Sequence, residues 1–426
     1  MNNRNEFIRQ YSTIIDSTLS VMLDRFERHP GYGYLDTKFD LITERENFDT
    51  ADPAMAFRSG RFVYSWIQGR GAESLAGHLQ ANINSADRIK SALRILCDKL
   101  YAAYLANGKR MFFILSPEGN FINPDGSPRT ETVPGEANYS DIFVSKGLLT
   151  AASALDDRAM LTEMSAWFKR ILDAIAANKF VTDQQPFDPA NPVAAQPGKI
   201  LQGPFMIALG GIANAAVITG DEAFLDYGCS FIKRILDIHT REVDGKTEFF
   251  EAVHEDDSPW IENGQLLCDP GHTLEFIGLA QRFLFILEKA NRPQDSELLK
   301  RCREFFPRLL KDTFAIGFSR QAQGVIKSYD LLSKKAINND MPWWSLPETI
   351  RAAAENEIFC NTDQSEIIRL CSNALWEKFT VPEYGYFAWQ TRDSRGIPSA
   401  AIPAVPDLDP GYHTNLALLD TIALWK

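Results

Sequence analysis

The chain has 426 residues, with 44 Lys and Arg against 56 Asp and Glu, which gives a formal net charge of −12. This acidic balance argues against nucleic acid as the main ligand, because binding to phosphates requires a positive footprint. Hydrophobic residues make up 45% and charged residues 23%, values that are ordinary for a folded protein and exclude general disorder. At about 150 residues per domain the length suggests two or three domains, although a closed barrel can use all of it as one.

The N-terminal residues and the spacing of the cysteines bear on the cellular location of the protein. The first ten residues carry Arg4, Glu6 and Arg9 and lack the apolar segment of a signal peptide. The six cysteines are spread singly with no CxxC pair, which is typical of a reducing environment and not of a disulfide framework or a zinc site. The sequence therefore predicts a cytoplasmic protein.

Residues 200–220 carry no charge and are long enough to span a bilayer, which takes about 20 residues. They also contain Pro204, Gly210, Gly211 and Asn214, so the segment is only moderately apolar. A helix that is apolar on all sides can be the inner member of a layered helical protein. We therefore predict a buried helix here and no membrane span.

Helical periodicity dominates the chain from end to end, and the helical segments come in pairs. The predicted helices cover residues 7–28, 54–69, 86–106, 140–152, 158–178, 204–219, 222–240, 272–289, 295–310, 347–357, 364–379 and 413–425. Short strand-like inserts are predicted over residues 111–115, 120–122 and 247–253. Three long connections, over residues 180–199, 314–340 and 392–410, have the length of functional lids or disordered segments.

Twelve helices in six hairpins predict an all-α fold, an (α/α)6 barrel with short β-hairpin inserts, formed as one catalytic domain over residues 1–426. In such a barrel the even-numbered helices form the inner ring. We therefore expect them to be the less polar set, because they are buried on two sides.

Polar and aromatic clusters recur where the even-numbered helices begin. In chain order they are Arg58 and Arg61; Tyr139, Ser140 and Asp141; Pro204, Phe205 and Met206; Pro270, Gly271, His272 and Glu275; Trp343, Trp344 and Glu348; and Gly411, Tyr412 and His413. Six inner helices entering from one end of a ring would aim these side chains at one cavity.

Each cluster also has a structural interpretation. His272 and Glu275 share a helix face at i, i+3, so the carboxylate can fix the orientation of the imidazole, but a histidine after a Pro-Gly turn can equally be a helix cap. The Trp343-Trp344 pair suits a core or a surface on which a sugar ring stacks. Arg61, surrounded by aromatic residues, is hard to explain as a solvated charge, and the alternative is a buried ion pair.

Other chemical templates do not fit. The chain has no GxxxxGK[ST] phosphate loop, no HExxH and no GxSxG motif. No set of residues has convincing metal-ligand spacing, so we predict no metal site.

Six short segments, in order along the chain, resemble the N-acylglucosamine 2-epimerase family and the related cellobiose 2-epimerases and aldose–ketose isomerases. The segments are Arg61-Phe-Val-Tyr-Ser-Trp66, Tyr139-Ser-Asp-Ile-Phe143, Pro204-Phe-Met206, Asp269-Pro-Gly-His-Thr-Leu-Glu275 (similar to N-P-G-H-x-x-E), Pro342-Trp-Trp344 followed by Glu348 (similar to P-W-W-x-x-x-E), and Tyr412-His413.

The resemblance implies an (α/α)6 barrel that acts on the open-chain form of a reducing sugar. By motif position His272 and His413 would be two acid/base groups that invert C2 through an enediolate, with Arg61 stabilising its oxygen. Glu275 and Glu348 would orient the bases or assist ring opening. Substrate contacts would come from Trp343, Trp344, Tyr139, Asp141, Met206 and Glu251. The resemblance also implies a homodimer, no required cofactor, and ATP as a possible allosteric activator.

Departures from the family pattern bear on the substrate. The cellobiose epimerase and isomerase branches carry a further histidine on the third inner helix, which residues 204–211 lack, and this favours the N-acylglucosamine branch. Thr414, Asn415 and Leu416 follow His413 where the family often has an arginine, and Gln265 replaces a common basic residue. The resemblance therefore determines the fold more firmly than the substrate.

The leading hypothesis is a sugar 2-epimerase that interconverts N-acylglucosamine and N-acylmannosamine. The alternative is an aldose–ketose isomerase of the mannose, glucose and fructose type, which shares the enediolate but returns the proton to C1. A glycoside hydrolase on the same barrel would need paired carboxylates, for which Asp141, Glu251, Glu275 and Glu348 are available, but it leaves both histidines unexplained. A non-catalytic sugar-binding protein ranks last, because both candidate bases are present.

Overall fold

A computed structural model describes residues 2–40, 42, 45–81, 85–185, 196–388, 391–399 and 407–426. This part of the chain contains twelve α-helices and short strands. It divides into two compact units, which are treated separately below. Unit 1 comprises Met1–Ile15, Pro197–Ala401 and His413–Lys426, and unit 2 comprises Asp16–Gln196 and Ile402–Tyr412. Helix α1 (Asn2–Arg28) contributes residues to both.

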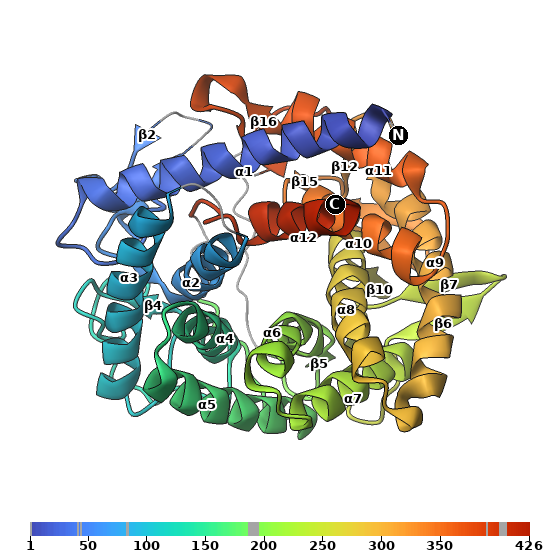
Figure 1. The fold of residues 1–426 in the computed structure, drawn as a ribbon, viewed down its shortest axis with the longest axis horizontal. Coiled ribbons are helices and arrows are strands. Elements are labelled where there is room, and N and C mark those ends of the chain that lie inside the picture. The colour runs from blue at the N-terminus through green and yellow to red at the C-terminus, as the bar shows by residue number, and fades with distance from the viewer. Residues whose placement is uncertain are drawn as a thin grey trace. The chain divides into compact units, whose positions relative to one another are not determined.

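Unit 2 is built on two helices in close contact. Its helices are α2 (Ser65–Gln80), α3 (Ala86–Ala106), α4 (Tyr139–Ala154) and α5 (Arg158–Ala176). Helix α2 packs against α4, with α3 against α2 and α5 against α4 (Figure 1). A Cβ atom at Gly147 would lie only 2.3 Å from the carbonyl oxygen of Gly69. Glycine at both positions therefore lets the two backbones touch.

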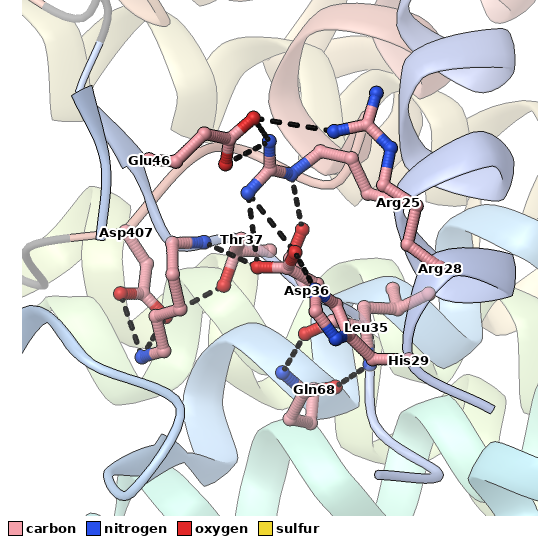
Figure 2. Close-up of polar contacts among 10 residues, drawn as sticks. Arg25, Arg28, His29, Leu35, Asp36, Thr37, Glu46, Gln68 and Asp407 are labelled. Carbon is pink, nitrogen blue, oxygen red and sulfur yellow. Dashed lines mark hydrogen bonds and ion pairs between the residues drawn. The ribbon is translucent and has the colours of Figure 1, made fainter. Parts of the chain in front are cut away.

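Buried ion pairs hold the first segment of unit 2 in place (Figure 2). Arg25 Nη2 donates to Asp36 Oδ2 at 3.0 Å. Lys38 Nζ lies 2.8 Å from Asp407 Oδ2, with both side chains fully buried. A buried charge is tolerated only when it is paired, so these contacts fix the residues on either side. The Lys38–Asp407 pair joins segments that are 369 residues apart in the sequence.

Four helices of unit 1 pack in chain order. The helices of this unit are α6 (Gly203–Thr219), α7 (Ala223–Ile238), α8 (Pro270–Ala290), α9 (Ser296–Gly317), α10 (Ser345–Phe359), α11 (Ser365–Ala374) and α12 (Ala417–Trp425). Helix α8 contacts α6 and α10, and α10 also contacts α12 (Figure 1). Helices α7, α9 and α11 cover α6, α8 and α10 respectively.

Burial and polarity both follow the predicted alternation, since each even-numbered helix is less polar than the odd-numbered helix before it. Most residues of α4, α6, α8 and α10 are buried, and α5 and α9 bury one stripe each. Helix α10 also buries three charged residues, Glu348, Arg351 and Glu355. The first two form an ion pair, which makes their burial tolerable.

The described strands are short, and every pair among them is antiparallel. Unit 2 contains β1 (Phe39–Asp40), β2 (Arg45–Glu46), β3 (Val63–Tyr64) and β4 (Ile114–Leu115). Unit 1 contains β5 (Ile200–Leu201), β6 (Thr240–Val243), β7 (Lys246–Phe249), β8 (Ala252–Val253), β9 (Ile261–Glu262), β10 (Gln265–Cys268), β11 (Phe318–Ser319), β12 (Gly324–Val325), β13 (Ser328–Asp330), β14 (Lys335–Asn338), β15 (Met341–Pro342), β16 (Thr380–Val381), β17 (Phe387–Ala388) and β18 (Thr391–Arg392). The largest described sheet has the order β14-β13-β10-β9.

Two predicted segments need correction. The helix predicted over residues 54–69 is a 3₁₀ turn (Pro53–Arg58) followed by β3, and α2 begins at Ser65. Ser59 and Gly60 lie between the 3₁₀ turn and β3 and break the helical periodicity. The apolar residues that follow form β3 before α2 begins. The connection over residues 314–340 is the end of α9 followed by β11 to β14, and not a lid.

Parts of the other two long connections, residues 186–195 and 400–406, lie outside the described residues. Among the helices that are described, none has both the length and the apolar composition needed to cross a membrane. Residues 200–220 contain β5 and the largely buried α6.

Candidate active site

The first histidine, His272, lies in the opening turn of α8. Asp269 caps the helix, since its Oδ1 accepts hydrogen bonds from the backbone N–H groups of Gly271 at 3.0 Å and His272 at 3.3 Å. Pro270 occupies the first helical position, where no hydrogen-bond donor is needed. A Cβ atom at Gly271 would lie 2.8 Å from the Trp344 ring, so glycine is required there.

Two carboxylates hold the imidazole of His272. Its Nδ1 lies 2.9 Å from Glu251 Oε2 and 3.5 Å from Asp269 Oδ2. Because an ionised carboxylate can only accept, Nδ1 carries a proton and Nε2 is left for chemistry. Burial lowers the pKa of His272, but Asp269 and Glu251 outweigh it and raise the pKa to about 9. The ring is therefore an imidazolium at neutral pH.

Glu251 is a buried residue of the turn between β7 and β8. Its Oε1 accepts from the Asp269 backbone N–H at 3.3 Å, and its Oε2 accepts from Gln202 Nε2 at 3.2 Å. The structure thus places Glu251, which we predicted to contact substrate, against the imidazole of His272. The expectation that Glu275 orients His272 is wrong, because Glu275 lies deeper along α8 and contacts His413.

The second histidine, His413, lies in a π-helical turn (Tyr412–Leu416) that leads into α12. Its Nδ1 lies 3.0 Å from Glu348 Oε1 and 3.8 Å from Glu275 Oε1. By the same argument Nδ1 carries the proton. Burial raises the pKa of Glu275, against the opposing effect of His413.

Arg351 supports Glu348 from one turn further along α10. Its guanidinium donates to Glu348 Oε2 and lies 3.5 Å from Asp420 Oδ2. A Cβ atom at position 278 of α8 would approach Arg351 Nε to 3.0 Å, so Gly278 leaves room for this side chain. The carboxylate that holds His413 is therefore itself held by a buried cation.

One indole ring joins the two histidines. The Trp344 ring centroid lies 5.6 Å from that of His272, with the planes at 25°, and 5.3 Å from that of His413, with the planes at 34°. Trp344 and its neighbour Trp343 are both buried. Two imidazoles, each with its Nδ1 on a carboxylate, thus pack against the same indole ring.

Glu275, Glu348 and His413 each offer a ligand atom, and these three atoms lie within 4.8 Å of one another. Such a set can hold a divalent cation. The guanidinium of Arg351 already neutralises Glu348, so we assign the three residues to the orientation of His413.

The remaining predicted site residues have local settings of their own. Met206 is buried in the first turn of α6. Arg61 belongs to unit 2, where its exposed side chain donates to Ser59 Oγ at 3.3 Å, so the buried ion pair considered for it is wrong. Tyr139 packs edge-on against Phe180, with ring centroids 4.8 Å apart.

Asp141, which we predicted to contact substrate, is a structural residue of α4. Its carboxylate accepts from Met111 N at 2.8 Å, from Arg110 Nε at 2.9 Å and from Asn138 N at 3.2 Å. The last contact completes a capping box with Asn138. These partners engage both oxygens of a buried side chain, so the carboxylate stabilises the start of α4.

Four residues of this site were not predicted as site residues from the sequence: Gln202, Asp269, Lys327 and Arg351. Lys327 Nζ donates to Asp269 Oδ2 at 2.6 Å. Arg351 had a detectable signal, since it follows Glu348 at i, i+3 on a helix. Lys327 lies in a connection without periodicity, where only the unusual length pointed to function.

Comparison with known proteins now identifies the family. The family model for N-acylglucosamine 2-epimerase (GlcNAc 2-epimerase) matches residues 83–417. The chain belongs to this family. Among curated protein sequences no relative matches.

Solved structures match over nearly the whole chain. A cellobiose 2-epimerase from Spirochaeta thermophila matches with a TM-score of 0.71 and 14% identity, covering 99% of this chain and 96% of that one. A sugar epimerase from a ruminal bacterium gives 0.70 and 13%, with 98% and 97% covered. A D-mannose isomerase gives 0.64 and 14%, with 95% and 97% covered.

These similarities confirm two predictions. With the twelve helices, they confirm the all-α, (α/α)6 fold class. At the level of the family, they confirm an isomerase that acts on carbohydrates.

Proposed function

We propose that the protein is a cofactor-independent sugar 2-epimerase that interconverts N-acylglucosamine and N-acylmannosamine. The observation that supports the proposal is that the imidazoles of His272 and His413 both pack against Trp344. Each ring has its Nδ1–H on a buried carboxylate, so proton transfer would use Nε2. Inversion at carbon requires a proton acceptor and a proton donor on opposite faces, and two such rings supply them.

The raised pKa of His272 assigns the first step. With a pKa of about 9, His272 enters the reaction as imidazolium and donates, so His413 is the group that accepts. His413 Nε2 removes the C2 proton of the open-chain sugar, and the C–H electron pair forms a C1=C2 double bond while the carbonyl electrons move onto the C1 oxygen, which gives an enolate for a 2-acylamino sugar and an enediolate for a 2-hydroxy sugar. His272 then returns a proton to C2 from the opposite face. In the reverse direction the two residues exchange roles.

Neighbouring groups have supporting roles. Glu251 and Glu348 stabilise the imidazolium that forms on each base. The Trp344 indole excludes water and supports the sugar ring. Stabilisation of the enediolate oxygen by Arg61, assembly as a homodimer, modulation by ATP and a cytoplasmic location remain predictions.

An aldose–ketose isomerase is the second candidate, and the match to a D-mannose isomerase supports it. It would use the same first step and return the proton to C1. The cellobiose epimerase and isomerase branches carry a further histidine on the third inner helix, and its absence from α6 favours the N-acylglucosamine 2-epimerase.

Proton NMR in D₂O with a panel of reducing sugars tests the proposal. The panel contains N-acetylglucosamine, N-acetylmannosamine, glucose, mannose, fructose and cellobiose, with and without ATP. We expect loss of the C2 proton signal of an N-acetylhexosamine together with the appearance of its C2 epimer. A ketose product would establish the isomerase instead. No exchange on any sugar would contradict both.

A further inference from the structure

Lys327 occupies an unusual place beside His272. It lies between β12 and β13, and its half-buried side chain reaches Asp269 Oδ2 at 2.6 Å. Its Nζ also lies 5.7 Å from the centroid of the Trp344 ring. One lysine therefore contacts both the helix cap and the indole against which His272 packs.

The charges around His272 explain why a cation is needed there. The titratable groups that act on His272 or on Lys327 are Asp269, Glu251 and Glu275. Asp269 and Glu251 both face Nδ1 of His272, so without another cation they would form an excess of negative charge in a largely buried place. The Lys327 ammonium neutralises one of them directly.

We propose that Lys327 is a positioning residue that fixes the Asp269 carboxylate and balances the two carboxylates that hold His272. Asp269 Oδ1 is occupied by the helix cap and Oδ2 by Lys327, so the carboxylate cannot turn to compete with Glu251 for the imidazole. Lys327 thereby keeps His272 on Glu251 and limits how tightly the ring holds its proton. This role in catalysis rests on the proposed function, whereas the electrostatic part does not.

The effect on His272 has a definite sign. The two carboxylates raise the pKa of His272, and the positive charge of Lys327 offsets part of that increase. Replacing Lys327 by an apolar residue is expected to raise that pKa further. Replacing Asp269 by asparagine, which is also a good helix cap, is expected to lower it.

The test follows the His272 ring by NMR titration in the resting protein, for wild type, Lys327→Met, Lys327→Arg, Asp269→Asn and the double variant. His78 and His239 do not interfere, because burial lowers the pKa of each to about 4. We expect Lys327→Met to shift the His272 titration upward by about 0.5 to 1 pH unit, Asp269→Asn to shift it downward, and the double variant to return it towards wild type. Lys327→Arg should stay near wild type.

Arg301→Met is the matched control. Arg301 pairs with Asp237 at 2.6 Å at the surface of unit 1, so the variant removes one charge and one ion pair away from the site. An unchanged His272 titration in Lys327→Met, or an equal shift in Arg301→Met, would overturn the proposal. If Lys327→Met does not fold, Asp269→Asn and Lys327→Arg decide it, since an unshifted titration in Asp269→Asn also overturns it.

The titration separates this inference from the proposed function. With the expected shifts and no turnover of any sugar, the proposed function fails and the role of Lys327 in setting the charge of His272 stands. If the enzyme turns over a sugar but the variants show no shifts in the His272 titration, the proposed function stands and the role of Lys327 fails.

Discussion

His272 and Glu251 form a hydrogen-bonded pair, with Nδ1 and Oε2 2.9 Å apart, although Glu251 belongs to a β-turn and not to the helix that carries the histidine. The pair fixes a proton on Nδ1, so that Nε2 is the nitrogen that faces the substrate in the proposed function. It also contributes to the raised pKa of His272. In the proposed function, this pair orients a histidine of the first turn of α8 for acid/base chemistry.

The pH dependence of activity follows from that pKa. In both directions of the epimerisation, one of His272 and His413 must be protonated and the other neutral. The forward and reverse reactions therefore have the same pH profile. As the pH rises through about 9, His272 loses its proton and the reactive form disappears. We expect kcat/KM to fall above about pH 9 in both directions, measured with each epimer over pH 6 to 10. A fall centred near pH 6.5 would contradict the raised pKa.

Glu251→Gln removes one of the two charges that hold the His272 proton. We expect the alkaline limb of kcat/KM to move down by about one pH unit and kcat at pH 7.5 to drop about tenfold or more. Glu262→Gln is the control, because Glu262 pairs with Lys199 at 2.8 Å in a half-exposed position. Unchanged kcat and an unmoved limb in Glu251→Gln would separate this residue from the mechanism.

The pair Glu348–Arg351 gives a prediction about stability. Both side chains are buried, so Arg351→Met leaves the Glu348 charge without its cation. We expect a loss of about 3 kcal/mol in the free energy of unfolding, measured by urea denaturation. The double variant Glu348→Gln/Arg351→Met should recover most of this loss while staying inactive. A single variant as stable as wild type would show that Arg351 is not needed to hold Glu348.

The close contact of α2 and α4 predicts a local steric effect. Gly147→Ala would place a methyl group 2.3 Å from the Gly69 carbonyl oxygen, which the backbone cannot relieve without moving one helix. We expect a loss of roughly 1 to 3 kcal/mol in the free energy of unfolding. Gly31→Ala is the control, since a Cβ there meets nothing within 4 Å. Equal stability of the two variants would contradict the observed contact.

The helices and the two histidines could be predicted from the sequence because their signals are local. Apolar spacing over residues 86–106 coincides with α3 from end to end, and the Pro-Gly-His motif lies at a helix start as expected. The start of the second helix was predicted too early, because a short run of apolar and aromatic residues before Ser65 is compatible with either a strand or a helix.

The partners of the histidines could not be predicted, because they come from segments far away in the chain. Glu251 and Lys327 lie in turns between strands, where no periodicity links them to α8. Asp141 shows the opposite error. Its position at a helix start suggested a substrate contact, but the same position makes it a capping residue.

Exchange of the C2 proton in single-base variants tests most directly the claim that His272 and His413 act on opposite faces of one carbon. Each variant, His272→Asn and His413→Asn, is incubated in D₂O with each N-acetylhexosamine separately and followed by proton NMR. The account predicts that neither variant epimerises its substrate. Each variant should exchange the C2 proton of only one epimer, and the two variants should act on different epimers. Epimerisation by either variant, or exchange of the same epimer by both, would contradict it.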